Sequence, residues 1–265
     1  MLARWLISDC TAGTCKATVT SMTMPKMLPP ASMPRRVKSL LRRLSGKVDR
    51  VGLSGTTLNV KGGTGQAPYS RAIDTGDHRS AVGFLLDWLA TQPEFASVKA
   101  VGHRVVHGMA HSEPEPVTPE LLDELRRITP YDPEHLPLEI ELIEAVRNRH
   151  PALLQVVSFD TAFHRTMPRV ASLLPIPRRY AAAGVRRYGF HGLSYEFLMA
   201  ELARLEDPAA TEGRVILAHL GNGASMAAVR DGRCIDSSMT PRQLRCFATF
   251  LVSSKSPLFL GSSTK

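Results

Sequence analysis

A histidine between two glycines is the strongest candidate for chemistry in this sequence. Residues 187–195 read Arg-Tyr-Gly-Phe-His-Gly-Leu-Ser-Tyr, so His191 precedes a segment that we expect to be a helix capped by Ser194. Glycines beside a large side chain indicate a sharp bend or a close approach of the backbone. A helix N-terminus offers unpaired N–H groups to an anion, to which His191 could also donate. The alternative is a glycine-rich turn in which His191 only packs.

Two charged side chains accompany apolar strands elsewhere in the chain. Arg104 lies in the predicted strand 98–106, and an arginine among valines needs an anionic partner, either a ligand or a structural salt bridge. Asp160 follows the predicted buried strand 152–158, where α/β folds usually place their chemistry, although it could equally cap the next helix.

The sequence offers little for a resident metal ion. His103 and His107 have the i, i+4 spacing of a helical metal pair, but their valine-rich flanks favour a strand and no third ligand is evident. The four cysteines show no metal-ligand spacing, which indicates free thiols in a reducing, cytoplasmic compartment.

The net charge of +9 is confined to the two ends of the chain. Residues 1–50 hold ten basic and two acidic side chains, and residues 237–265 hold four basic and none acidic. The remaining 51–236 carry 19 basic and 22 acidic residues, so the folded body has no basic excess for a nucleic acid to bind. We find no apolar run of about 18 residues and therefore expect no transmembrane helix.

Periodicity places these residues on elements of an α/β fold. We expect strands at 48–53, 56–60, 98–106, 152–158, 215–220, 224–229 and 234–237, and helices at 79–91, 118–128, 138–149 and 194–205. His135 lies in a predicted loop, 130–137, and 62–65 is a glycine-rich turn without the lysine of a phosphate loop. The basic run 35–44 could form an amphipathic turn or two on a solvated surface.

The turn Gly221-Asn222-Gly223 joins two predicted strands. Backbone N–H groups freed by glycine in such a turn can wrap nucleotide phosphates, and the alternative is an ordinary meander.

Five stretches in a fixed order resemble the acetate kinase family, in the actin-like ATP-binding superfamily. They are Gly102–Gly108, Asp132–Pro137, Phe159–His164, Arg187–Gly192 and Ala218–Ser225. The resemblance runs from about Val48 to Met239. It implies an α/β, actin-like (ribonuclease H-like) kinase fold with a first domain and an incomplete second domain.

The resemblance also implies a reaction. The family transfers the γ-phosphoryl group of ATP to acetate, with Mg²⁺, giving acetyl phosphate and ADP; propionate or butyrate is an alternative acceptor. By position, Asp160 resembles the catalytic carboxylate, Arg104 the residue that binds acetate and the phosphoryl group, and His191 a transition-state stabiliser. His135 and Phe190 would line the substrate site. The ATP-phosphate segment would be His219, Leu220, Gly221, Asn222 and Gly223. The family also implies a homodimer.

The ends depart from the family pattern. The expected Asn-x-Gly-Ser-Ser-Ser-x-Lys turn has its nearest counterpart in Asp9–Lys16, and the helix after His191 begins Gly-Leu-Ser-Tyr where the family usually has Gly-Thr-Ser-His. We therefore divide the chain into a divergent region (1–45), a first domain (46–185), the start of an ATP-binding domain (186–239) and an aberrant tail (240–265). One or both ends would be frameshifted or rearranged. A catalytically inactive remnant is the competing function.

Overall fold

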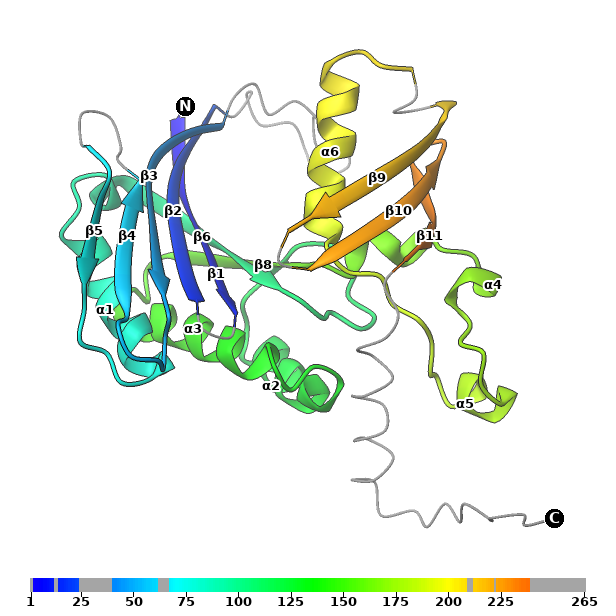
Figure 1. The fold of residues 1–265 in the computed structure, drawn as a ribbon, viewed down its shortest axis with the longest axis horizontal. Coiled ribbons are helices and arrows are strands. Elements are labelled where there is room, and N and C mark those ends of the chain that lie inside the picture. Colours follow the sequence, from blue (N-terminus) through cyan, green and yellow to red (C-terminus); the bar gives the residue numbers. More distant parts are fainter. Residues whose placement is uncertain are drawn as a thin grey trace, which may run out of the picture.

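The computed structural model describes residues 2–11, 14–23, 40–61, 67–208, 212–221 and 223–238. It contains an eight-stranded sheet with helices packed on it and a separate three-stranded sheet, with α6 between the two (Figure 1). The strand order of the large sheet is β5-β4-β3-β2-β1-β6-β8-β7.

The large sheet has an antiparallel half and a parallel half. Its strands are β1 (Leu2–Thr11), β2 (Thr14–Thr23), β3 (Leu40–Asp49), β4 (Thr57–Lys61), β5 (Tyr69–Ala72), β6 (Val98–Val105), β7 (Glu115–Pro116) and β8 (Leu154–Phe159). The first five pair antiparallel in chain order, whereas β1 with β6 and β6 with β8 pair parallel. The two-residue edge strand β7 pairs antiparallel with β8. Arg104 is in register with Ser158, so the carboxyl ends of β6 and β8 lie side by side.

The basic run 35–44 does not become helical where the structure describes it. Residues 40–44 are part of β3, so the expected amphipathic turn is wrong there. Leu44, Gly46 and Val48 are buried and alternate with partly exposed neighbours, which is the period of a strand. A Cβ on Gly46 would lie 2.6 Å from the Trp88 ring, so this glycine leaves room for a core side chain. The strands β1 and β2 were not predicted either.

Helices pack on the large sheet: they are α1 (His78–Ala90), α2 (Pro119–Ile128) and α3 (Leu136–Arg149). Further along the chain are α4 (Arg169–Ser172), α5 (Arg178–Ala182) and α6 (Gly192–Arg204). Short 3-10 helices occur at Phe95–Ser97 (η1), Thr129–Tyr131 (η2) and Ala162–Thr166 (η3). Thr118 caps α2 as expected, since its hydroxyl accepts from the Leu121 N–H at 3.2 Å. Helix α3 begins inside the predicted loop because a proline is tolerated in a first helical turn.

Two apolar clusters lie between the large sheet and the helices packed on it. In one, α1 and α3 pack on β3, β4 and β6, with the four residues expected to face inward, Val82, Leu85, Leu86 and Leu89, all at most 2% exposed. In the other, α2 and α3 pack over the ends of β6 and β8. Val105 and Phe159 belong to this second cluster and are the chain neighbours of Arg104 and Asp160, so the cluster fixes the backbone beside both positions.

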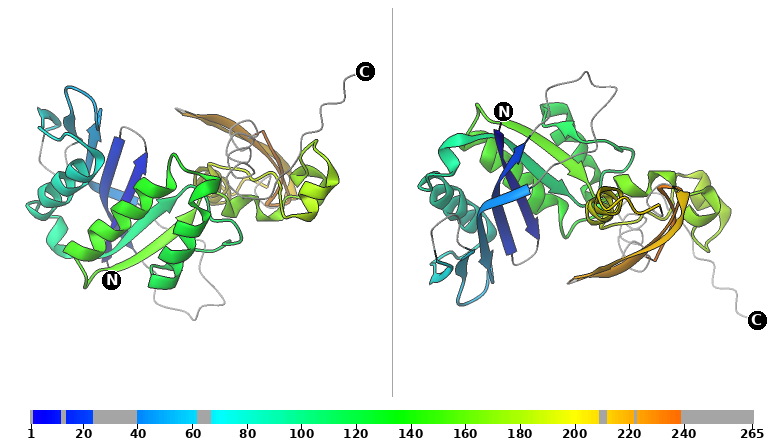
Figure 2. Two further views of the ribbon diagram at one scale, coloured as in Figure 1. Left: turned by 90° about the horizontal axis from the view of Figure 1, so that it is seen from below. Right: turned by 90° about the horizontal axis from the view of Figure 1, so that it is seen from above.

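A third cluster lies under the small sheet. The strands β9 (Arg214–Leu220), β10 (Ala224–Arg230) and β11 (Arg233–Ser237) form an antiparallel meander, as the sequence predicts. Their inner face packs on α6 and on Phe163 of η3. Both further views place α6 at the junction of the two sheets (Figure 2). Within the described ranges no helix is long and apolar enough to cross a bilayer.

Candidate active site

Arg104 and Asp160 meet at the carboxyl ends of the two parallel strands. The Asp160 N–H donates to the Val105 carbonyl at 3.0 Å, which carries the β6–β8 pairing one residue past β8. Arg104 then donates to Asp160 Oδ2 from Nη2 at 2.6 Å and from Nε at 3.0 Å. The Asp160 side chain is 1% exposed and the Arg104 side chain 25%. The alternative that Asp160 caps the next helix is wrong, because Thr161 holds the cap position of η3.

The segment before α6 is fastened directly to Asp160. The Gly192 N–H donates to the Asp160 carbonyl at 2.9 Å, and a Cβ on Gly192 would lie only 2.1 Å from that oxygen. This is the close backbone approach that the glycine predicts. His191 itself has φ 61° and ψ 23°, the left-handed conformation that is uncommon for residues other than glycine. The residues expected to be catalytic therefore come together.

His191, rather than Ser194, is the cap residue of α6. Its side chain makes no capping hydrogen bond, so the expected Ser194 cap is wrong. Ser194 lies within the first helical turn, and its hydroxyl is 3.1 Å from His219 Nδ1. Helix propensity does not predict the left-handed backbone at His191. Because of it, α6 begins at Gly192, two residues before the expected start at Ser194.

The His191 ring is held by β9 and β10 of the small sheet. Nδ1 of His191 is 2.8 Å from the Ser225 hydroxyl, and the ring stacks on His219 with centroids 4.1 Å apart. Burial lowers the pKa of His191, and the nearby His219 acts in the same direction. A histidine with a lowered pKa is neutral at pH 7, so it has one N–H to donate.

The glycine turn lies over this histidine pair. The Gly221 N–H donates to the Gly223 carbonyl at 3.2 Å, and Asn222 is outside the described residues. A Cβ on Gly223 would lie 3.4 Å from His191 Cε1, and one on Gly221 would lie 2.7 Å from His219 Nε2. The predicted ATP-phosphate segment and the predicted stabilising histidine are thus adjacent. Leu220, which the sequence also assigns to this segment, is 85% exposed.

His135 lies next to Asp132, three residues away in the chain. Its Nδ1 is 2.8 Å from Asp132 Oδ1. That hydrogen bond raises the pKa of His135, against the effects of burial and of the positive Arg104. His135 is therefore protonated more readily than a free histidine.

Phe190 stands between the histidines of two motifs. Its ring lies edge-on to the His107 ring, with the ring centroids 5.7 Å apart. Its carbonyl accepts a hydrogen bond from His164 Nε2 at 3.0 Å. His103 and His107 are 3% and 2% exposed, and burial lowers the pKa of each to about 4. They belong to the packed interior, and within the described residues no three His, Cys, Asp or Glu side chains form a group able to hold a metal ion.

Four side chains that contact the candidate residues were not singled out from the sequence. They are Asp132, His164, Tyr195 and Ser225. Three of them belong to the motifs that carry the family resemblance, and Tyr195 stands where the sequence departs from the family pattern. Their motif position was the available signal, but the side chain that each contacts depends on tertiary packing.

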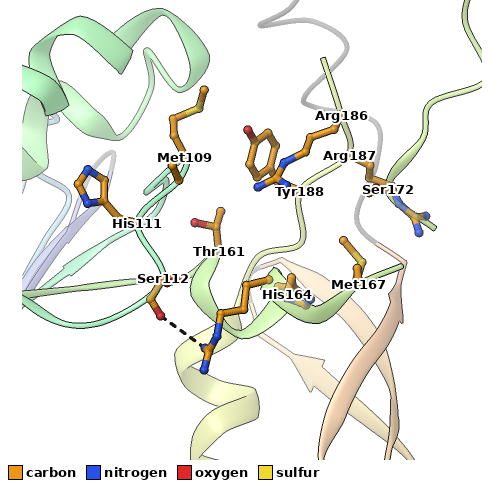
Figure 3. A pocket seen from close by; sticks show the side chains of 12 residues that line it. Met109, His111, Ser112, Thr161, His164, Met167, Ser172, Arg186, Arg187 and Tyr188 are labelled. Carbon is orange, nitrogen blue, oxygen red and sulfur yellow. Dashed lines mark hydrogen bonds between the residues drawn. The ribbon is translucent and has the colours of Figure 1, made fainter. Parts of the chain in front are cut away.

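A cavity adjoins the candidate site, but the Arg104–Asp160 pair does not line it. Thr161 and His164 line it together with Met109, Arg186 and Tyr188 (Figure 3). Arg104, Asp160 and His191 are not among its lining residues. The cavity is therefore not the place where the predicted catalytic side chains converge.

The fold has the features expected of the actin-like kinase class: a mixed sheet whose parallel strands end beside Arg104 and Asp160, and a glycine-turned hairpin beyond α6. A model of the Acetokinase family matches residues 34–246, which is most of the chain. The chain belongs to the acetokinase family.

Individual relatives agree with this assignment. An acetate kinase of Methylocella silvestris is 45% identical over 187 residues, covering 69% of this chain and 46% of the relative, and one of Deinococcus radiodurans is 43% identical over 199 residues, covering 74% and 50%. The crystal structure of Porphyromonas gingivalis acetate kinase matches with a TM-score of 0.71 and 30% identity, over 89% of this chain and 57% of that one. A propionate kinase from Francisella tularensis matches with a TM-score of 0.73 and 27% identity, over the same shares. The chain spans about half the length of the curated relatives it matches.

Proposed function

We propose that this protein is a phosphotransferase that moves the γ-phosphoryl group of ATP to the carboxylate of acetate, giving acetyl phosphate and ADP, in a reversible reaction. The observation that carries this proposal is the convergence of Arg104, Asp160 and His191 beside the glycine turn Gly221–Gly223. The relatives named as acetate kinases support it.

The transfer needs charge stabilisation more than covalent help. A carboxylate oxygen of the acceptor forms a bond to the γ-phosphorus while the bond from that phosphorus to the ADP oxygen breaks. Arg104 and the His191 N–H would donate to the transferring oxygens, and the glycine turn would let backbone N–H groups approach the other phosphates. Because an ionised carboxylate has no proton to lose, Asp160 is not required as a base. Its role would be to hold the Arg104 guanidinium at the acceptor.

The described residues do not by themselves make a site for the Mg²⁺ that the family implies. Within the described residues, no three metal-ligating side chains lie close enough together to hold an ion. The carboxylate of the candidate site, Asp160, is buried and bound to Arg104. Mg²⁺ in kinases is commonly held largely by substrate phosphates, so it would enter with ATP. The roles proposed for Arg104, Asp160 and His191 do not depend on it.

Propionate is the second candidate acceptor, because the Francisella tularensis structure that this chain matches is a propionate kinase. Butyrate, a homodimer and a cytoplasmic location remain proposals that rest on the family. The proposed boundary near residue 185 has partial support: α6 and the small sheet share their own apolar cluster, but Phe163 belongs to that cluster too.

The test is acyl phosphate formation by the purified chain. ATP, Mg²⁺ and either acetate or propionate are supplied, and the product is trapped with hydroxylamine. Turnover that Asp160→Asn abolishes and Asp123→Asn leaves intact would support the proposal, because Asp123 is an exposed helix carboxylate paired with Arg126. Absence of turnover from a folded chain would refute the proposed activity and favour a catalytically inactive family member.

A further inference from the structure

Three side chains form a buried hydrogen-bonded series that ends at His191. The Tyr195 hydroxyl is 2.5 Å from Ser225 Oγ, and Ser225 Oγ is 2.8 Å from His191 Nδ1. Tyr195 is fully buried and Ser225 is 4% exposed. These groups come from α6 and β10, so the packing of the helix on the small sheet aligns them.

The protons of this series can be counted. Burial raises the pKa of Tyr195, which keeps its hydroxyl proton, and Ser225 also has one proton. If Tyr195 donates to Ser225 and Ser225 donates to His191 Nδ1, each proton has an acceptor. If Nδ1 carried a proton instead, the proton of either Tyr195 or Ser225 would have no acceptor that the structure shows within the described residues. A buried donor without an acceptor is unfavourable, so the first arrangement is preferred.

We propose that Ser225, oriented by Tyr195, is a positioning residue that holds His191 with Nδ1 unprotonated and Nε2–H as its single donor. The tautomer follows from the geometry alone, whereas its use rests on the proposed function.

The Nε2 edge of His191 faces the glycine turn. A Cβ on Gly223 would lie 3.5 Å from Nε2, and the stacked His219 ring restricts rotation of His191. The N–H fixed by Ser225 is therefore directed toward the segment proposed to bind the ATP phosphates. A ring with the other tautomer would present a lone pair there, which repels an anionic oxygen. The hydrogen bonds from Tyr195 to Ser225 and from Ser225 to His191 thus make Nε2 of His191 a donor, rather than an acceptor, toward the glycine turn.

The experiment is a histidine NMR titration of the full chain. Long-range ¹H–¹⁵N spectra of the histidine-labelled protein report which ring nitrogen is protonated, and a His191→Gln spectrum identifies the signals. We expect Nε2 of His191 to carry the proton in the neutral form. We also expect Ser225→Ala to raise the pKa of His191 by about half to one unit, because the lost hydrogen bond favours the neutral ring. Tyr195→Phe should act in the same direction but less.

Several titratable or charged groups influence the same titration and stay in place in these variants. They are His219, Asp160, Arg104 and His164. Tyr180→Phe and Ser172→Ala, which remove hydroxyls remote from this series, should leave the His191 titration unchanged.

The inference is overturned if neutral His191 carries its proton on Nδ1, or if Ser225→Ala lowers its pKa or leaves it unchanged. Neither readout requires turnover. An inactive chain with the expected tautomer would refute the proposed function alone, and an active chain with the opposite tautomer would refute this inference alone.

Discussion

A single oxygen of Asp160 receives both hydrogen bonds from Arg104, from Nη2 at 2.6 Å and from Nε at 3.0 Å. The carboxylate is 1% exposed, so it is removed from water and depends on this guanidinium for compensation. The same contact would place the Arg104 charge at the acceptor. Stability and proposed activity are therefore coupled at this pair.

Removing the guanidinium should destabilise the protein. We expect Arg104→Met to lower the free energy of unfolding by about 3 kcal/mol, because it leaves the Asp160 charge buried without its partner. Adding Asp160→Asn should recover part of this loss, since the second change removes the uncompensated charge. Urea unfolding of the two single variants and the double variant measures the coupling energy.

The exposed pair Asp123–Arg126 is the matched comparison. Its side chains are 69% and 47% exposed, and its coupling energy should stay under about 1 kcal/mol. Equal and weak coupling at both pairs would contradict the assignment of Asp160 as a buried charge held by Arg104.

Gly192→Ala should damage the junction between Asp160 and His191. The new methyl group would lie 2.1 Å from the Asp160 carbonyl oxygen, so the backbone must move and the hydrogen bond from the Gly192 N–H must weaken. We expect a loss of about 1–3 kcal/mol in the free energy of unfolding. Any turnover should fall as well, because His191 moves with this backbone.

Gly76→Ala is the control for that substitution. No atom lies within 4 Å of a Cβ built at Gly76. This variant should unfold within about 0.5 kcal/mol of the parent. A Gly192→Ala protein as stable as Gly76→Ala would show that the close approach is not required.

The parts of the fold with strong local periodicity could be predicted from the sequence. Helix α1 and the meander β9–β11 follow their hydrophobic patterns closely, because burial of one face determines both. The run at 40–44 could not be assigned in this way: its leucines and arginines fit a helical turn as well as a strand, and pairing with distant residues decides the outcome.

The candidate site was predictable in its members but not in its contacts. Arg104, Asp160 and His191 were identified from strand ends and from glycines, which have local signatures. Ser225 and Asp132 were not, because a serine or an aspartate has many possible partners until the fold brings one of them within reach.

Stability should decrease in mild acid because of two buried histidines. Burial lowers the pKa values of His103 and His107 from 6.5 to about 4, so between these values the unfolded chain binds more protons than the folded one. Their contribution is fully present above pH 6.5 and is lost as the pH falls toward 4. We expect each to remove roughly 2 kcal/mol between pH 8 and pH 5.

Urea unfolding at a series of pH values measures this dependence. His103→Gln removes one titrating group, so its stability should fall less steeply with acid than that of the parent, whatever its stability at pH 8. His103 is 2.7 Å from the Gln155 side-chain amide, with which a glutamine could also form a hydrogen bond. An unchanged slope in His103→Gln would contradict a neutral buried His103.

For acetate binding, the Asp132–His135 pair predicts a trend opposite to that of stability: binding weakens as the pH rises. The hydrogen bond from Asp132 raises the pKa of His135, so His135 keeps its positive charge to a higher pH than a free histidine would. If this cation helps to bind the anionic acceptor, the Michaelis constant for acetate should rise as the pH passes upward through the raised pKa. Asp132→Asn should move that rise to lower pH.

An NMR titration of His135 checks the same shift without turnover. Asp132→Asn should lower the pKa of His135, because its principal favourable partner is lost while burial and the Arg104 charge continue to oppose protonation. Glu115→Gln, which removes the carboxylate 2.6 Å from His111, should leave the His135 titration unchanged. If the His135 titration moves in Asp132→Asn while the acetate profile of an active chain does not, His135 is charged by Asp132 but does not bind the acceptor. If neither moves, the Asp132 contact does not control His135, and another group must set its charge.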